Sequence, residues 1–297
     1  MSEEKYLKHC AILSMDNLDD FEAYDHLLDQ PMAQLGWKNH LVSWHDESIN
    51  WHDYDVVLIR TPWDYQDDAE KFLTVLEKIE QSTALLENSI DIVRWNINKK
   101  YLRELEQKGV TIVPTLWKES FDESELLGYF EHFNTTQIVI KPCVSANADN
   151  TFWLKKDDFS QHVDELKVAF ASRDFMVQPF MSSVIDEGEF SCFYFDGQYS
   201  HSILKTPKDN DFRVQEEHGG RLTLITPEAK LVAQAQHSLA QINEMPMYAR
   251  VDFVRFGDEF AMMEAELIEP SLYFNMDPAS PQKFADAFVA RMARLSV

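Results

Sequence analysis

The chain has 297 residues, of which 45% are hydrophobic, enough to bury a core arranged as one large domain or as two to three subdomains. Its 27 lysines and arginines oppose 51 aspartates and glutamates, and the formal charge of −24 repels nucleic-acid backbones and anionic lipid surfaces. We therefore expect no nucleic acid and no membrane as a partner.

The first ninety residues alternate short apolar runs with helical patterns. This alternation predicts an open, parallel α/β sheet, in which ligands bind at the carboxyl ends of the strands. One such end carries Arg60, Trp63 and Asp64, although a turn with a packed tryptophan and a local ion pair of Arg60 with Asp64 or Asp55 stays an alternative. The expected strands are His9–Leu13, His40–Trp44, Val56–Arg60 and Ala84–Leu86, and the expected helices are 19–35 and Ala69–Glu80.

The middle of the chain reads as mixed α+β and the last third as an antiparallel sheet. Asp196-Gly197 and Gly257-Asp258 are hairpin turn signals, each flanked by two strand-like runs. The expected elements are helix Asn96–Lys108, extended Val110–Pro114, a helix after the capping box Asp122-x-x-Glu125, strand Gln137–Lys141, strand Thr151–Leu154, helix Asp158–Phe170, strand Phe175–Pro179, the two hairpins, and helices starting at Thr226-Pro227 and Ser280-Pro281.

Three carboxylates are expected to meet in the second hairpin. Glu264 and Glu266 lie two residues apart and share one face of a strand, and hairpin pairing places Asp252 opposite them. Such a cluster needs cations, and oxygen ligands suit Mg²⁺ shared with phosphates. The alternative is that these residues simply face solvent in an acidic chain.

Two lysines complete the set. Lys141 ends a buried-looking strand directly before Pro142, where a lone ammonium group requires an anionic partner. Lys99 lies on the preceding helix, so that both lysines could flank one polyphosphate, although a lysine on a helix is often only solvated.

Taken in order, these residues resemble the ATP-grasp superfamily over residues 90–275. The resemblance is sharpest to the glutathione-synthetase-like branch and, within it, to bacterial cyclo-ligases of the D-cycloserine synthetase (O-ureido-serine cyclo-ligase) type. The strings that carry it are Arg94-Trp95-Asn96, Lys141-Pro142-x-x-Ser145-Ala146 and Glu264-Ala265-Glu266-Leu267-Ile268-Glu269-Pro270-Ser271. It implies an ATP-grasp fold of α/β and α+β class, with an open parallel α/β domain (1–90), a small subdomain with a linker helix (91–180) and a C-terminal antiparallel Mg/ATP subdomain (181–297).

The resemblance also implies ATP and Mg²⁺ or Mn²⁺ as cofactors and a role for each matching residue. The residues implied in nucleotide binding are Lys99, Lys141 and Ser145 at the phosphates, Gln178, Pro179 and Phe180 at the adenine, and Glu189, with Glu187 as fallback, at the ribose. The implied metal ligands are Asp252, Glu264 and Glu266. Catalysis is assigned to Arg250 and to Arg213, the best carboxylate clamp of its loop, and substrate recognition to Arg60, Asp64, Glu269 and Ser271.

The implied activity is that of an ATP-dependent carboxylate–amine ligase that forms an amide through an acyl phosphate on a small amino-acid-like substrate, within one molecule or between two. One alternative is a peptide-extending ligase. Another is a nucleotide-binding regulatory protein without turnover, because Cys143–Asn150, where a phosphate-covering loop rich in glycine is typical, has no glycine. The oligomeric state stays open, with a homodimer as one option. The acidic, non-apolar start of the chain and three scattered cysteines lead us to expect a cytoplasmic protein.

Overall fold

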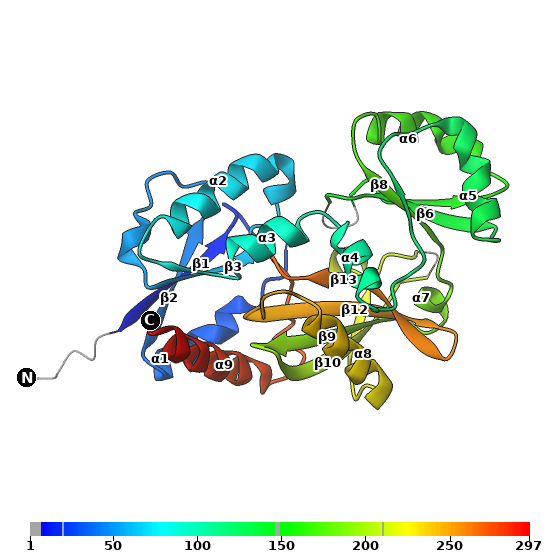
Figure 1. Cartoon of the computed structure of the whole chain (residues 1–297). Helices are drawn as coiled ribbons and strands as arrows, with labels where there is room; N and C mark the ends of the chain where they lie inside the picture. The colour runs from blue at the N-terminus through cyan, green and yellow to red at the C-terminus, as the bar shows by residue number, and fades with distance from the viewer. Residues whose placement is uncertain (1–6, 20, 146–148, 210) are drawn as a thin grey trace, which may run out of the picture.

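The computed structural model describes residues 7–19, 21–145, 149–209 and 211–297, which form three β-sheets with helices packed around them (Figure 1). Residues 146–148 of the predicted phosphate loop, which include Asn147, lie outside the described residues. Within the described ranges, none of the helices combines the length and the apolar character needed to cross a bilayer.

The N-terminal sheet is parallel throughout, with the strand order β2-β1-β3-β4, as the sequence predicted. Every residue of its central strand β3 is buried, which is typical of a parallel strand covered on both faces. The elements are β1 (Lys8–Ser14), α1 (Asp29–Gln34), β2 (Trp37–Ser43), β3 (Val56–Thr61), α2 (Ala69–Glu80) and β4 (Leu85–Glu87).

The C-terminal sheet is antiparallel and contains both predicted hairpins. Its strand order is β11-β10-β9-β12-β13. Asp196 and Gly197 take φ angles of 47° and 75°, the left-handed conformation that a tight two-residue turn requires, between β9 and β10. The elements are β9 (Glu189–Phe195), β10 (Gln198–Thr206), β11 (Arg221–Ile225), α8 (Ala229–Ala240), β12 (Tyr248–Phe256), β13 (Glu259–Glu266) and α9 (Ser280–Leu295).

The third sheet, in the order β5-β8-β6-β7, belongs to a small lobe at the upper right of Figure 1. Helices α5 and α6 pack on it through a core of their own that includes Phe130, Leu166 and Phe175. Its elements are β5 (Leu116–Lys118), α5 (Leu126–His132), β6 (Gln137–Pro142), β7 (Phe152–Lys155), α6 (Val163–Ala169) and β8 (Phe175–Pro179), and the short α7 (Ser183–Asp186) follows it.

Several local expectations differ from the structure, among them the helix expected from Thr226-Pro227, which starts only at Ala229. The helix expected over Asn96–Lys108 is divided into α3 (Ile90–Asn96) and α4 (Tyr101–Gln107). Helix α4 packs into the core of the C-terminal sheet, whereas α3 contributes Ile92 to that core and Ile90 and Val93 to the core of the N-terminal sheet. The run Val110–Pro114 forms only an isolated bridge between Ile112 and Met262, and the region 19–35 becomes helical only from Asp25. In each case, long-range packing determines the boundary, and sequence periodicity does not show it.

Helix α9 is joined to the other parts of the fold by Arg291, which is buried. Its Nε donates to Glu87 Oε1 at 2.6 Å, and its Nη1 donates to Asp196 Oδ1 at 3.1 Å and to the carbonyl of Met245 at 3.0 Å. Glu87 ends β4 and is only 2% exposed, and burial raises the pKa of its carboxyl group. Arg291 is therefore the counter-ion of a carboxylate that water does not reach.

Replacing Arg291 by methionine should destabilise the protein by about 3–5 kcal/mol, because the change leaves a buried carboxylate without its partner. Urea denaturation followed by circular dichroism measures the effect. Arg294→Met is the matched control. Arg294 pairs with the same Asp196 but its side chain is 58% exposed, so its loss should cost less than about 1 kcal/mol. Equal losses for both variants would contradict this assignment.

Candidate functional site

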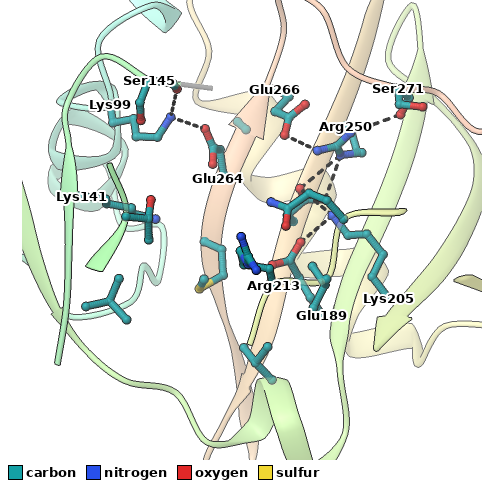
Figure 2. Close-up of a pocket in the computed structure, with 18 of the residues that line it drawn as sticks. Lys99, Lys141, Ser145, Glu189, Lys205, Arg213, Arg250, Glu264, Glu266 and Ser271 are labelled. Atoms are coloured by element: carbon teal, nitrogen blue, oxygen red, sulfur yellow. Dashed lines mark hydrogen bonds and ion pairs between the residues drawn. The ribbon is translucent and has the colours of Figure 1, made fainter. Parts of the chain in front are cut away.

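One open cavity lies where the three sheets meet, with about 1630 Å³ of empty space including its mouth (Figure 2). Most of the site residues predicted from the sequence line it. They are Lys99, Lys141, Ser145, Gln178, Pro179, Phe180, Glu189, Arg213, Arg250, Asp252, Glu264, Glu266, Glu269 and Ser271. The predicted site residues that do not line it are Arg60, Asp64 and Glu187.

The two predicted lysines approach the cavity from the same side but differ in their contacts (Figure 2). Lys99 Nζ lies 2.7 Å from Glu264 Oε1 and donates to the carbonyl of Ser145 at 2.8 Å. Lys141, on β6, forms no ion pair with any described residue, and burial lowers the pKa of its ammonium group. A half-buried cation without an ion-pair partner provides a binding position for an anionic ligand.

At one end, the cavity is lined by residues that join the small lobe to the loop after β10. Phe180, directly after β8, stacks on Trp153 with ring centroids 4.4 Å apart. Phe212, in the loop between β10 and β11, meets the Trp153 ring edge-on at 5.5 Å. Gln178 donates to Thr115 Oγ1 at 2.9 Å, which fixes the amide beside these rings. The end of β8 and the loop that carries Arg213 are therefore in direct contact.

The backbone at Gly188 decides which of two glutamates enters the cavity. Gly188 has φ 122°, and a Cβ there would lie 2.9 Å from the carbonyl oxygen of Lys205, so only glycine fits. Glu189 follows it into the cavity and pairs with Lys205 at 2.5 Å. Glu187 points elsewhere and pairs with Arg255 at 2.8 Å. The fallback position Glu187 is therefore not part of the cavity wall.

The hairpin register places the three predicted metal ligands on one face. In the register of β12 and β13, Asp252 lies directly opposite Glu264, as the sequence predicted, and Arg250 lies directly opposite Glu266. The carboxylates do not form the expected bare cluster, because cations separate them. Arg250 Nε is 3.1 Å from Asp252 and its Nη2 contacts Glu266, while Lys205 lies 3.2 Å from Asp252. Within the described residues, no three potential metal ligands stand close enough together to hold an ion.

A divalent cation nevertheless fits part of this wall. Burial, opposed by Arg250 and reinforced by the charges of Asp252 and Glu264, raises the pKa of Glu266 to about 7. Mg²⁺ is usually held by one or two carboxylates and completed by substrate phosphates, and Glu264 and Glu266 meet that requirement. Asp252 fits it less well, because Ser191, Lys205 and Arg250 already donate to it.

Two arginines line the cavity in different settings. Arg250 is buried, and its Nη1 donates to the carbonyl of Ser271 at 3.2 Å in addition to its two carboxylate contacts. Arg213 pairs with Asp211 at 2.9 Å and its side chain is 39% exposed, which places it nearer the mouth. Arg250 is therefore a fixed positive charge in the wall, and Arg213 belongs to a more accessible loop.

The expectation that Arg60 faces the cavity is wrong. Its side chain is fully buried, with Nε 2.8 Å from Asp25 Oδ1 and Nη2 donating to the carbonyl of Pro270 at 2.8 Å. The alternative of a local ion pair with Asp64 or Asp55 is also wrong, because the partner of Arg60 is Asp25, 35 residues away. Asp64 accepts hydrogen bonds from Trp44 and contacts His45, each at 2.7 Å, and also lies outside the cavity.

The contact of Arg60 with Pro270 belongs to a series along the segment Leu267–Ser271. Each carbonyl of this segment accepts a hydrogen bond from a side chain of another element. The donors, in the order of the carbonyls, are Asn88, Tyr248, Trp63, Arg60 and Arg250. The segment that carries Glu269 and Ser271 into the cavity is therefore fixed along its whole length.

Other cavity residues were missed by the sequence analysis. Lys205 is buried between Glu189 and Asp252, and its position on an apolar strand shortly before Pro207 repeats the signal that identified Lys141. Phe21 and Tyr65 also line the cavity. No local pattern indicated them, since both lie in or beside loops of the N-terminal sheet.

Comparisons with known proteins agree with this geometry. Residues 10–88 match the family model described as the N-terminal domain of D-cycloserine synthetase DcsG. The cycloserine biosynthesis protein DcsG of Streptomyces lavendulae is 29% identical over 259 residues, covering 80% of this chain and 84% of that protein.

Two solved structures show the same architecture. The crystal structure of D-cycloserine synthetase DcsG has a TM-score of 0.85 at 23% identity and covers 96% of this chain and 99% of its own. D-Alanine–D-alanine ligase from Bacillus anthracis, complexed with ATP, has a TM-score of 0.70 at 15% identity, with 97% and 98% covered. The chain has the ATP-grasp fold, as the sequence predicted.

Lys141→Ala should weaken the binding of a non-hydrolysable ATP analogue by about 10- to 100-fold, because a charge-assisted contact contributes roughly 1.5–3 kcal/mol. Isothermal titration calorimetry measures this, with the melting temperature as a check on folding. Lys100→Ala is the control, since Lys100 pairs with Asp174 at 2.5 Å and does not line the cavity. An unchanged affinity in folded Lys141→Ala protein would remove Lys141 from the nucleotide site.

The same lysine predicts a pH dependence. A lysine is charged below its pKa, and burial lowers the pKa of Lys141, so its charge disappears at a less alkaline pH than usual. The affinity for the ATP analogue should therefore fall as the pH rises from about 7.5 to 10. In Lys141→Arg, whose guanidinium stays charged, this decline should be absent. Equal pH profiles for the two proteins would contradict the assignment.

Proposed function

We propose that this chain, an ATP-grasp carboxylate–amine ligase, phosphorylates the carboxylate of a small amino-acid-like substrate and joins the acyl phosphate to an amine, with release of ADP and phosphate. The observation that carries the proposal is Lys141, a half-buried cation that forms no ion pair in the described part of the chain, in the same cavity as the carboxylate wall of β13. That pairing of charges suits a polyphosphate that is bound by ammonium groups on one side and by carboxylate-bound cations on the other.

The nucleotide is proposed to bind between the small lobe and the C-terminal sheet. Gln178, Pro179 and Phe180 line the cavity at the end of β8 and would contact the adenine. Glu189 uses Oε1 for Lys205, and its second carboxylate oxygen would accept from the ribose hydroxyls. Lys99 and Lys141 would hold the phosphates.

Glu264 and Glu266 would hold Mg²⁺ together with the phosphates. Bound there, the ion would neutralise phosphate charge during transfer. Lys99 pairs with Glu264 and Arg250 contacts Glu266, so that each of these carboxylates lies beside a basic group that would also contact the nucleotide.

The reaction requires the protein chiefly to position the reactants and to stabilise the charge that develops on the phosphoryl group. A carboxylate does not react with amines because oxide is too poor a leaving group, whereas phosphate leaves an acyl phosphate readily. Transfer of the phosphoryl group spreads negative charge over its oxygens, and a preorganised cation stabilises that charge. Arg250 is held in place by Asp252, Glu266 and the Ser271 carbonyl, so it would supply this charge without reorganisation.

The substrate is proposed to lie beyond the phosphates, against Glu269, Ser271 and the aromatic side chains of the N-terminal domain. The nearby wall includes Phe21, Trp63 and Tyr65. The space is limited on that side by the fixed segment Leu267–Ser271. The likeness to D-cycloserine synthetase supports a small amino acid derivative whose attacking amine belongs to the same molecule.

Purified protein incubated with ATP, Mg²⁺ and a panel of amino-acid carboxylates should release ADP and phosphate in equal amounts only when its substrate is present. Hydroxylamine should intercept the acyl phosphate as a hydroxamate, which mass spectrometry identifies. Lys141→Ala protein purified in the same way controls for contaminating ATPases. Release of AMP and pyrophosphate would contradict the acyl phosphate, and ADP formation only with peptide acceptors would favour a peptide-extending ligase.

A further inference from the structure

Glu269 is an exception among the buried and half-buried carboxylates of the cavity. The others each contact a basic side chain, since Glu264 has Lys99, Glu189 has Lys205, and Asp252 and Glu266 have Arg250. In the described part of the chain, no lysine, arginine or histidine forms an ion pair with Glu269. Its carboxylate lines the cavity and therefore faces the space where a ligand binds.

The surroundings of Glu269 are aromatic. The Tyr65 hydroxyl interacts with its carboxyl group, and Trp63 Nε1 donates to its backbone carbonyl at 2.9 Å. The ring of Phe21 lies 5.3 Å from that of Trp63, and all three aromatic side chains line the same cavity. The loops after β1 and β3 thus bring aromatic rings next to an unpaired carboxylate.

A carboxylate beside aromatic rings is a recognition site for a cation. The faces of tryptophan, tyrosine and phenylalanine attract ammonium groups, and a carboxylate adds a charge-assisted hydrogen bond. Burial and the charge of Glu266 raise the pKa of Glu269 to about 8, and the charge of Lys99 opposes this shift only in part. A substrate ammonium group would bring a further positive charge to this point.

We infer that Glu269, with Phe21, Trp63 and Tyr65, forms a subsite for a protonated amino group of the substrate. The inference rests on the proposed function and names its substrate class as a carboxylic acid that carries a primary amine. An ammonium group has no free electron pair, so the amine bound here is recognised and does not attack the acyl phosphate. The attacking amine is then a second nitrogen, in the same molecule or in another one.

The test compares substrates that differ only in this amine. Wild-type protein, ATP and Mg²⁺ are incubated with the D and L forms of alanine, serine, 2,3-diaminopropionate and O-ureidoserine, each beside the analogue in which hydrogen replaces the α-amino group. ADP release gives KM for each compound. The wild type should use at least one amino acid with a KM about 10-fold or more below that of its deaminated analogue, as expected for a charge-assisted contact.

Glu269→Gln should abolish that preference by raising KM for the amino acid about 10-fold or more, while KM for ATP stays within about 2-fold. Glutamine has the shape of the protonated carboxyl group and leaves the Trp63 contact with the backbone intact. Phe21→Leu should raise the same KM by a smaller factor, about 3-fold, because it removes only an aromatic face.

Glu104→Gln is the matched control, since Glu104 also lies beside a tryptophan and a tyrosine, Trp95 and Tyr101, but does not line the cavity. Its kinetics should equal those of the wild type. A Glu269→Gln protein that keeps the preference for the amino acid would overturn the inference and leave the ligase function standing. A wild type without carboxylate-dependent ADP release across the panel would overturn the proposed function, and this inference with it.

Discussion

The active cavity depends on a row of hydrogen bonds to consecutive backbone carbonyls, from Leu267 to Ser271. The segment leaves β13 and has no neighbouring strand, so its carbonyls would be unsatisfied when buried. Side-chain donors satisfy these carbonyls in the way that the N–H groups of a neighbouring strand would. Because Asn88, Trp63 and Arg60 belong to the N-terminal part of the chain, the same bonds fix the N-terminal sheet against the C-terminal one. The same hydrogen bonds therefore fix the cavity wall and the contact between the two sheets.

Around that wall the charges are arranged in alternation. Lysines and arginines lie between carboxylates, so that burial is tolerated in a chain with a net charge of −24. Among the buried and half-buried charged groups of the cavity that the structure describes, Lys141 and Glu269 form no ion pair. In the function proposed above, Lys141 binds an anionic part of the ligands and Glu269 a cationic part.

Sequence reasoning succeeded where a local rule fixes geometry. The turn signal Gly257-Asp258 set the β12–β13 hairpin, and strand periodicity then placed Asp252, Glu264 and Glu266 on one face. It failed at Arg60, because its partners are 35 and 210 residues away and cannot be identified from the residues around it. It favoured Glu189 but kept Glu187 as a fallback, because the close approach of β10 to Gly188, which separates the two glutamates, has no local sequence signal.

The contact between Phe180, Trp153 and Phe212 connects two parts of the cavity wall that belong to different elements. Phe212 immediately precedes Arg213, so a ligand bound against Phe180 would touch the same group of rings that holds the arginine loop. If such a ligand stabilised those rings, it would tighten the binding of whatever Arg213 contacts, and the second ligand would tighten the binding of the first by the same factor, because coupling between two ligands is reciprocal. The rings would then make the two ligands bind cooperatively, whichever of them enters first.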